Sequence, residues 1–279
     1  MSRNQALQTF SQDLSISHSQ IFSYLTCSLN YHFKYVKQQP PERISINLPF
    51  GRAIHSAMET AYRSIKNTGL VEPVNTIVEV FEECLNLDLD ATTVPIVYKK
   101  ASPDRSGALA LGKAMLEVFH ENIVRTVQTA QIVEVELPLS AKLYTDEGQP
   151  TEFKLVGILD LLLMDDAGEI IIVDNKTAAQ PMSQTAADDD HQMTCYSYLI
   201  AANSFIFPTA KVKCRFDVLR KLKKKPKLEQ VETFRTAQHR KRFARIANAV
   251  LAGIDTGIFM PQPSWMCSDC AYSDACKSW

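Results

Sequence analysis

The residues best suited to chemistry lie in the stretch from Gly157 to Thr177. Two apolar runs there flank a short polar turn at 165–168, a pattern that is typical of a β-hairpin. Asp160 interrupts the first run, and Asp174 and Lys176 stand at the end of the second. Residues two apart on a strand share a face, so Asp174 and Lys176 are expected to point the same way.

Two carboxylates and an ammonium group on apolar strands are costly to bury without partners. A hard divalent cation is a suitable partner, because Mg²⁺ is held in proteins by one or two carboxylates with water in its other positions. The sequence therefore predicts a metal-dependent catalytic centre on the hairpin, with Asp160 and Asp174 as ligands.

The elements that must position this centre change in character along the chain. Ser17 and Gln20 fit a capping box, which predicts a first helix with Cys27 inside it. Its apolar residues follow helical spacing and are expected to face inward: Ile21, Phe22, Leu25, Leu29 and Phe33. Apolar spacing predicts further helices at 50–66, 73–89, 106–130, 191–202 and 236–256, and strands at 132–139, 153–164, 169–176, 211–220 and 228–234.

Three polar residues before the hairpin admit two interpretations each. His55, on the second helix, is either a structural histidine or a metal ligand. Arg52, close to one turn earlier, can meet a phosphate or a surface acid. Glu136 shares a strand face with Glu134 and is either an additional active-site acid or part of a solvated face.

Polar residues after the hairpin extend the candidate site. Gln192 and Tyr196 are four residues apart on a predicted helix and therefore share a face. The acids at 188–190 precede this helix, where the helix dipole favours negative charge without any catalytic role. The basic segment 221–227 is either a solvated turn or a phosphate contact.

Composition bounds the class of protein. The chain has 279 residues, 46% of them apolar and 22% charged, with a net charge of −1, which is ordinary for a soluble globular protein. A run of about 18 apolar residues is missing, which argues against a membrane span, and the first residues lack the apolar core of a signal peptide. These features predict a cytoplasmic protein.

The seven cysteines are an odd number without a secretion signal, which argues against a disulfide framework. Cys267, Cys270 and Cys276 crowd into the C-terminal end, which suggests a metal or cluster site. Cys27 is either a buried core residue or a fourth ligand for this trio. Four thiolates hold zinc or an iron–sulfur cluster equally well by spacing alone.

The order of the motifs resembles the PD-(D/E)XK nuclease superfamily. It reads G-x-x-x-H at 51–55, G-x-x-D at 157–160, D-x-K at 174–176 and Q-x-x-x-Y at 192–196. The nearest branch by this pattern is the RecB-like exonucleases, which include the CRISPR-associated RecB-like nuclease and the nuclease domains of helicase–nuclease complexes. The resemblance spans residues 14–276.

The resemblance implies a role for each matched residue. The metal ligands implied are His55, Asp160, Asp174 and the carbonyl of Asn175. Catalysis is implied for Asp160, Asp174 and Lys176, and strand contacts for Gln192, Tyr196 and Arg52. The metal is expected to be Mg²⁺ or Mn²⁺. Asn175 departs from the aromatic or aliphatic residue often found at its position, and its side chain is expected to point away from the metal.

Some members of the branch hold a [4Fe-4S] cluster with one cysteine before the nuclease core and three after it, spaced C-x-x-C-x5-C. The cysteines that match this arrangement are Cys27, Cys267, Cys270 and Cys276. The resemblance therefore favours an iron–sulfur cluster over zinc and predicts that it joins the C-terminal tail to the first helix.

The implied fold is α/β, with a restriction-endonuclease-like central mixed sheet flanked by helices. We expect one nuclease domain over 1–279, with a mainly helical part at 14–130, a catalytic sheet at 131–235, and a helix with a cysteine-bearing tail at 236–279.

The implied function is a metal-dependent exonuclease on single-stranded DNA, in DNA repair, recombination or CRISPR adaptation. A channel for a single strand is implied too, lined by basic residues of the 221–227 segment and the last long helix. The partners expected are DNA and helicase or CRISPR adaptation proteins, with no membrane. The alternative is a catalytically silent DNA-binding scaffold subunit of such a complex.

Overall fold

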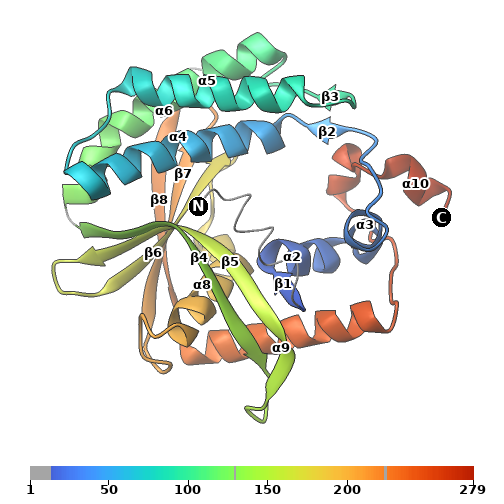
Figure 1. Cartoon of the computed structure of the whole chain (residues 1–279). Coiled ribbons are helices and arrows are strands. Elements are labelled where there is room, and N and C mark those ends of the chain that lie inside the picture. Colours follow the sequence, from blue (N-terminus) through green and yellow to red (C-terminus); the bar gives the residue numbers. More distant parts are fainter. Residues whose placement is uncertain (1–13, 129, 223–224) are drawn as a thin grey trace.

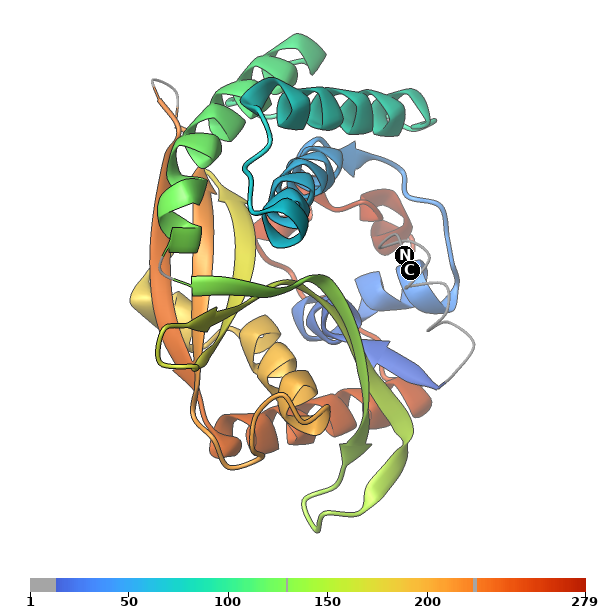
Figure 2. The same cartoon turned by 60° about the vertical axis from the view of Figure 1, so that its left-hand side comes forward.

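The hairpin at the middle of the sequence forms the centre of a mixed sheet with helices on both faces (Figures 1 and 2). A computed structural model describes residues 14–128, 130–222 and 225–279, without the side chains of 124–128. The N-terminal segment 1–13, where the predicted domain begins and a signal peptide was sought, and Lys223 and Lys224 of the basic segment lie outside the described residues.

The sheet follows the order β1-β5-β6-β7-β8, and β4 pairs with β5. Its strands are β1 (Ser15–Ser17), β4 (Ala130–Tyr144), β5 (Pro150–Asp165), β6 (Ile170–Ala178), β7 (Val212–Arg220) and β8 (Lys227–Arg235). The β1–β5 and β6–β7 pairs are parallel, and the other pairs are antiparallel. The predicted α/β fold with a mixed central sheet is confirmed. The three-residue strand β1 is an addition to the prediction.

Two hydrophobic cores lie on opposite faces of the sheet. One face is covered by α4 (Asn47–Thr68), α5 (Val74–Asp90) and α6 (Arg105–Gln128). The other face is covered by α2 (His18–Thr26), α8 (His191–Ala202) and α9 (Ala237–Asp255). The smaller elements are α3 (Ser28–Tyr31), η1 (His32–Val36), β2 (Ile44–Ser45), β3 (Ile96–Val97), α7 (Gln184–Asp188), η2 (Trp265–Asp269) and α10 (Ser273–Lys277).

A gap in the pairing of β5 creates the position of the site. Strand β4 pairs along one edge of β5, so β1 and β6 share the other edge. β1 pairs with residues 154–156, and β6 pairs with residues 161–164. Neither ladder includes residues 157–160, so side chains from both faces can converge at this point of the edge.

The start of the first helix is confirmed, but its continuation differs from the prediction. Ser17 and Gln20 form the capping box at the start of α2. Cys27 does not lie inside a helix; its backbone is extended, at φ −161° and ψ 103°. The helix breaks there because the next residues bond to the C-terminal segment: the Leu29 amide donates to the Met260 carbonyl at 3.1 Å.

The inward orientation predicted for the apolar residues of this helix holds only in part. Ile21 is fully buried, whereas Phe22 is 48% exposed and Leu25 is 40% exposed. Farther along the chain, Leu29 and Phe33 are buried as predicted. Of the described helices, none has the length and apolar character that a membrane span requires.

Candidate functional site

Asp160 lies in the part of β5 that neither β1 nor β6 pairs. Its side chain is buried, and the Asn175 amide of β6 donates to its Oδ2 at 2.9 Å. Gly157, at the start of this part, permits close approach of α8, because a Cβ there would lie 2.9 Å from Leu199 Cδ1 and 3.4 Å from Tyr196 Cε1. The glycine and the backbone hydrogen bond together fix Asp160 against its neighbours.

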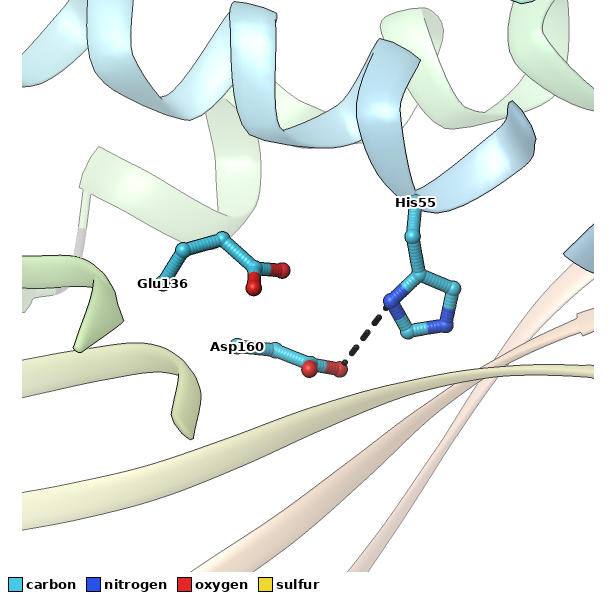
Figure 3. Close-up of side chains that lie close together, drawn as sticks. All are labelled: His55, Glu136 and Asp160. Atoms are coloured by element: carbon cyan, nitrogen blue, oxygen red, sulfur yellow. Dashed lines mark ion pairs between the residues drawn. The ribbon is translucent and has the colours of Figure 1, made fainter. Parts of the chain in front are cut away.

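His55 and Glu136 come to Asp160 from two other elements, α4 and β4 (Figure 3). His55 Nδ1 lies 3.4 Å from Asp160 Oδ2. One ligand atom from each of the three residues lies within 4.8 Å of the other two. Nitrogen and carboxylate oxygens in this arrangement suit a divalent cation, so the donor chemistry fits a candidate divalent-metal site.

Glu136 belongs to the group although the sequence left it between two interpretations. The solvated-face interpretation does not hold, because Glu136 faces α4, where His55 lies. Its φ of 48° is in the left-handed region, which costs a non-glycine residue roughly 1–3 kcal/mol and often marks functional sites. Glu134 faces α4 too, as alternation predicts, but it pairs with Lys66 at 2.6 Å instead.

The D-x-K and Q-x-x-x-Y motifs meet as one hydrogen-bonded group. Lys176 Nζ lies 2.8 Å from Asp174 Oδ2 and donates to Gln192 Oε1 at 2.5 Å. Gln192 Nε2 donates to Asp174 Oδ1 and to the Tyr196 hydroxyl, each at 2.8 Å. The motifs that are far apart in sequence therefore converge on the Asp174 carboxylate.

Burial shapes the protonation of this group. Asp174 is 1% exposed, and this burial raises its pKa to about 7; Lys176 opposes the shift, and Asp160 reinforces it. Burial lowers the pKa of Lys176, but the Asp174 carboxylate outweighs it and leaves that pKa above its usual value. Lys176 is therefore charged at neutral pH, and Asp174 titrates near neutral pH.

The remaining predicted site residues take varied positions. Tyr196 is 4% exposed, and its hydroxyl is turned to Gln192. Asn175 is buried, and its amide supports Asp160. Arg52 Nε donates to Asp88 Oδ2 at 3.0 Å on α5, which is the surface-acid interpretation. The contacts of Gln192, Tyr196 and Arg52 with a DNA strand stay predictions, as does the metal contact of the Asn175 carbonyl.

Some of the basic residues expected to line a channel for a DNA single strand form hydrogen bonds within the protein instead. Arg240 of α9 is buried and donates to Ser197 Oγ and to the Pro208 and Ala210 carbonyls. Lys221 donates to Asn47 Oδ1 at 2.9 Å, and burial lowers its pKa to about 8. Arg240 therefore has a structural function rather than a place in a channel.

The four candidate cluster cysteines gather where the C-terminal segment packs on α3. Cys27, Cys270 and Cys276 pack against the same small core, and Cys267 acts electrostatically on Cys276. Within the described part of the chain, no three of these sulfurs lie within 4.8 Å of one another. Two backbone amides point to sulfur: Ser264 N to Cys267 Sγ at 3.4 Å, and Tyr272 N to Cys270 Sγ at 3.5 Å.

Comparisons with known proteins concern the fold of the chain. Among solved structures, a protein from Eubacterium rectale named as a candidate exonuclease is similar in fold, with a TM-score of 0.55 and 9% identity over 100% of this chain and 92% of that one. SSO0001 aligns with a TM-score of 0.34 and 14% identity over 93% of this chain and 95% of that one. No curated protein matches the sequence.

A family model described as the PD-(D/E)XK nuclease superfamily matches residues 15–277, nearly the whole described chain. The mixed sheet with flanking helices is consistent with the restriction-endonuclease-like fold of that superfamily. The chain belongs to the PD-(D/E)XK nuclease superfamily.

Proposed function

We propose that the protein is a metal-dependent deoxyribonuclease that hydrolyses phosphodiester bonds at the ends of single-stranded DNA. The observation that carries this proposal is the close group of His55, Glu136 and Asp160 at the unpaired part of β5, with the Asp174–Lys176 ion pair on the neighbouring strand β6. Membership of a nuclease superfamily supports the reaction class, and binding of DNA follows from it.

Within the described chain, the close group of possible ligands is His55, Glu136 and Asp160, and Asp174 is not part of it although its carboxylate interacts electrostatically with Asp160. We infer that Asp174 and the Asn175 carbonyl would join His55, Glu136 and Asp160 in holding the cation. A divalent cation bound there neutralises phosphate charge and lowers the pKa of a bound water. Asp160 and Asp174 are buried, so a cation would give their carboxylates the partner that buried charges need.

Lys176 supplies the positive charge of the protein itself. Its Nζ is anchored by Asp174 and Gln192, which leaves the ammonium group at a fixed place beside the carboxylate. In this place it can hold a water or a phosphate oxygen by a charge-assisted hydrogen bond. Gln192 then acts as the brace that sets the orientation of both side chains, and Tyr196 supports Gln192.

The RecB-like branch, the preference for single-stranded ends and a role in repair, recombination or CRISPR adaptation belong to the same proposal. The order of the motifs supports the branch, and the exonuclease name of the similar Eubacterium rectale protein agrees with it. Partners would then be a helicase or CRISPR adaptation proteins. The alternative, a silent DNA-binding scaffold, is less favoured because such a subunit has no need of an intact His55, Asp160, Asp174 and Lys176.

A cleavage assay on end-labelled single-stranded DNA tests the proposal. We expect linear strands to be degraded with Mg²⁺ or Mn²⁺ and to stay intact with EDTA, and we expect circular strands of the same length to persist. Cleavage of circles would replace the exonuclease with an endonuclease. Absence of cleavage on DNA of every form and on RNA would favour the scaffold.

We further propose that the cysteines hold a [4Fe-4S] cluster: Cys27, Cys267, Cys270 and Cys276. Amide hydrogen bonds to sulfur are typical partners of cluster thiolates. The same four thiolates could hold zinc, and the resemblance to the RecB-like branch favours the cluster.

Metal analysis of anaerobically purified protein distinguishes the two. Iron near four per chain with a brown colour is expected, and Cys267→Ser should lose it while the matched change Cys84→Ser, on α5, should keep it. A colourless protein with one zinc per chain would contradict the cluster and support the zinc alternative.

A further inference from the structure

A cavity of about 850 Å³ extends from the group around Lys176 and Gln192, called here the catalytic group, to the four candidate cluster cysteines. Among the described residues, one side of its lining comes from α2 and the residues that follow it, and another from the C-terminal segment 261–276. Lys176 and Gln192 belong to the lining, so the cavity reaches the proposed site of hydrolysis from its Lys176 side.

Helix α2 lines the cavity from its first residue, His18, to its last, Thr26. It has nine residues and is therefore about 13 Å long. At its start, His18 interacts electrostatically with Lys176 and Asp190. At its end lies Cys27, next to Cys276. The catalytic group and the cysteines thus lie at opposite ends, with the middle of α2 between them.

Two large aromatic rings with substantial exposure belong to the lining. Phe22, one turn after His18, is 48% exposed, and its ring stacks on the His18 ring with the centroids 6.0 Å apart. Trp265 on η2 is 80% exposed. A folded chain gains about 25 cal/mol for each Å² of apolar surface that it buries, so these rings are kept in solvent at a cost. Exposed aromatic residues that line a common cavity are typical of a binding site.

The charges of the lining favour bases over phosphates as the occupants. The lining includes two lysines, Lys34 and Lys176. Two of its carboxylates are engaged by the fold, since Asp190 accepts from the Met193 amide and Asp269 pairs with Lys99. Phosphates bind where cations are dense, whereas planar bases bind where aromatic and apolar side chains lie.

We propose that this cavity holds the unpaired bases of a DNA single strand, which stack on Phe22 and Trp265 on their way to Lys176. This inference rests on the proposed function, because the strand is its substrate. Bases in a duplex are paired and stacked on one another, so they cannot offer their faces to the two rings. Stacking here selects single strands over duplexes.

Binding to a fluorescent single strand, without added divalent metal, tests the inference. Stacking on one aromatic side chain strengthens binding about 5- to 100-fold per base, so Phe22→Ala and Trp265→Ala should each weaken binding by about tenfold. The matched control is Phe207→Ala, a 79% exposed ring outside the cavity lining, which should bind as the unmodified protein does. A strand with abasic sites should bind weakly, and with equal affinity, to the unmodified protein and to all three variants.

Tryptophan fluorescence gives a readout that needs no loss of binding. The chain has two tryptophans, Trp265 and Trp279, so Trp279→Phe leaves Trp265 as the only one. A bound base strand should quench this emission, and an abasic strand should not. An unchanged emission with a fully bound base strand would overturn the inference.

The same assays separate the inference from the proposed function. If the protein degrades DNA but both aromatic variants bind and cleave like the Phe207→Ala control, the strand lies elsewhere and the inference is wrong. If base stacking is seen but no DNA is cleaved, the inference stands and the nuclease proposal is wrong.

Discussion

Replacing Asp174 by asparagine should remove one contribution to the stability of the metal-free protein, a contribution that falls between about pH 4 and pH 7. The carboxyl is 1% exposed, and burial raises its pKa from 3.8 to about 7. The folded state then binds a proton that the unfolded state has released, so the free energy of unfolding falls as pH rises across this window. At about 1.4 kcal/mol for each pH unit, the loss reaches about 4 kcal/mol.

Urea denaturation at a series of pH values with EDTA measures this dependence. Relative to Asp174→Asn, the wild type should lose up to about 4 kcal/mol between pH 4 and 7. The comparison with the variant is needed because burial lowers the pKa of His18 to about 4, and His18 then contributes a rise in stability over the same window in both proteins. The exposed control Asp255→Asn should follow the wild type. Mg²⁺ at pH 8 should restore the stability of the wild type alone. The same slope in Asp174→Asn and wild type would refute the argument that burial shifts this carboxyl.

Three further substitutions test the positions of neighbouring residues. Glu136→Gln should weaken Mg²⁺ binding, measured by calorimetry, about tenfold or more, whereas Glu134→Gln, which loses only the Lys66 pair, should not. Gly157→Ala should lower the free energy of unfolding by roughly 1–3 kcal/mol, because its Cβ would crowd α8; a neutral result would contradict this packing. Arg235→Met should lower the free energy of unfolding by about 3 kcal/mol or more, because the fully buried guanidinium donates hydrogen bonds to the Ala187 and Asp190 carbonyls and the variant leaves both carbonyls without this donor. A variant as stable as the wild type would show that these carbonyls find other partners.

Local chemistry made much of the fold predictable. The turn at 165–168 and the capping box of Ser17 and Gln20 depend on residues that are close in sequence, and both form. The order of the motifs was enough to predict one site that contains Asp174, Lys176 and Gln192, and these three side chains contact one another.

Features that depend on distant segments were missed. Strand β1 has three residues and gains its partner, β5, only after most of the chain has folded. The break at Cys27 depends on how residues near Met260 dock, because Met260 accepts from the Leu29 amide. The position of Glu136 depends on α4 lying over β4, which alternation along a strand cannot reveal.

The most direct test of the account is the rate of DNA hydrolysis by Asp174→Ala and Lys176→Ala beside the wild type and Arg52→Lys. All four proteins should be compared on one labelled single strand with saturating Mg²⁺ or Mn²⁺, after circular dichroism shows that each is folded. The account predicts that both alanine variants fall by about a hundredfold or more, because one loses a metal ligand and the other the charge beside it. Equal cleavage by the wild type and both alanine variants would contradict the assignment of this site as the catalytic centre.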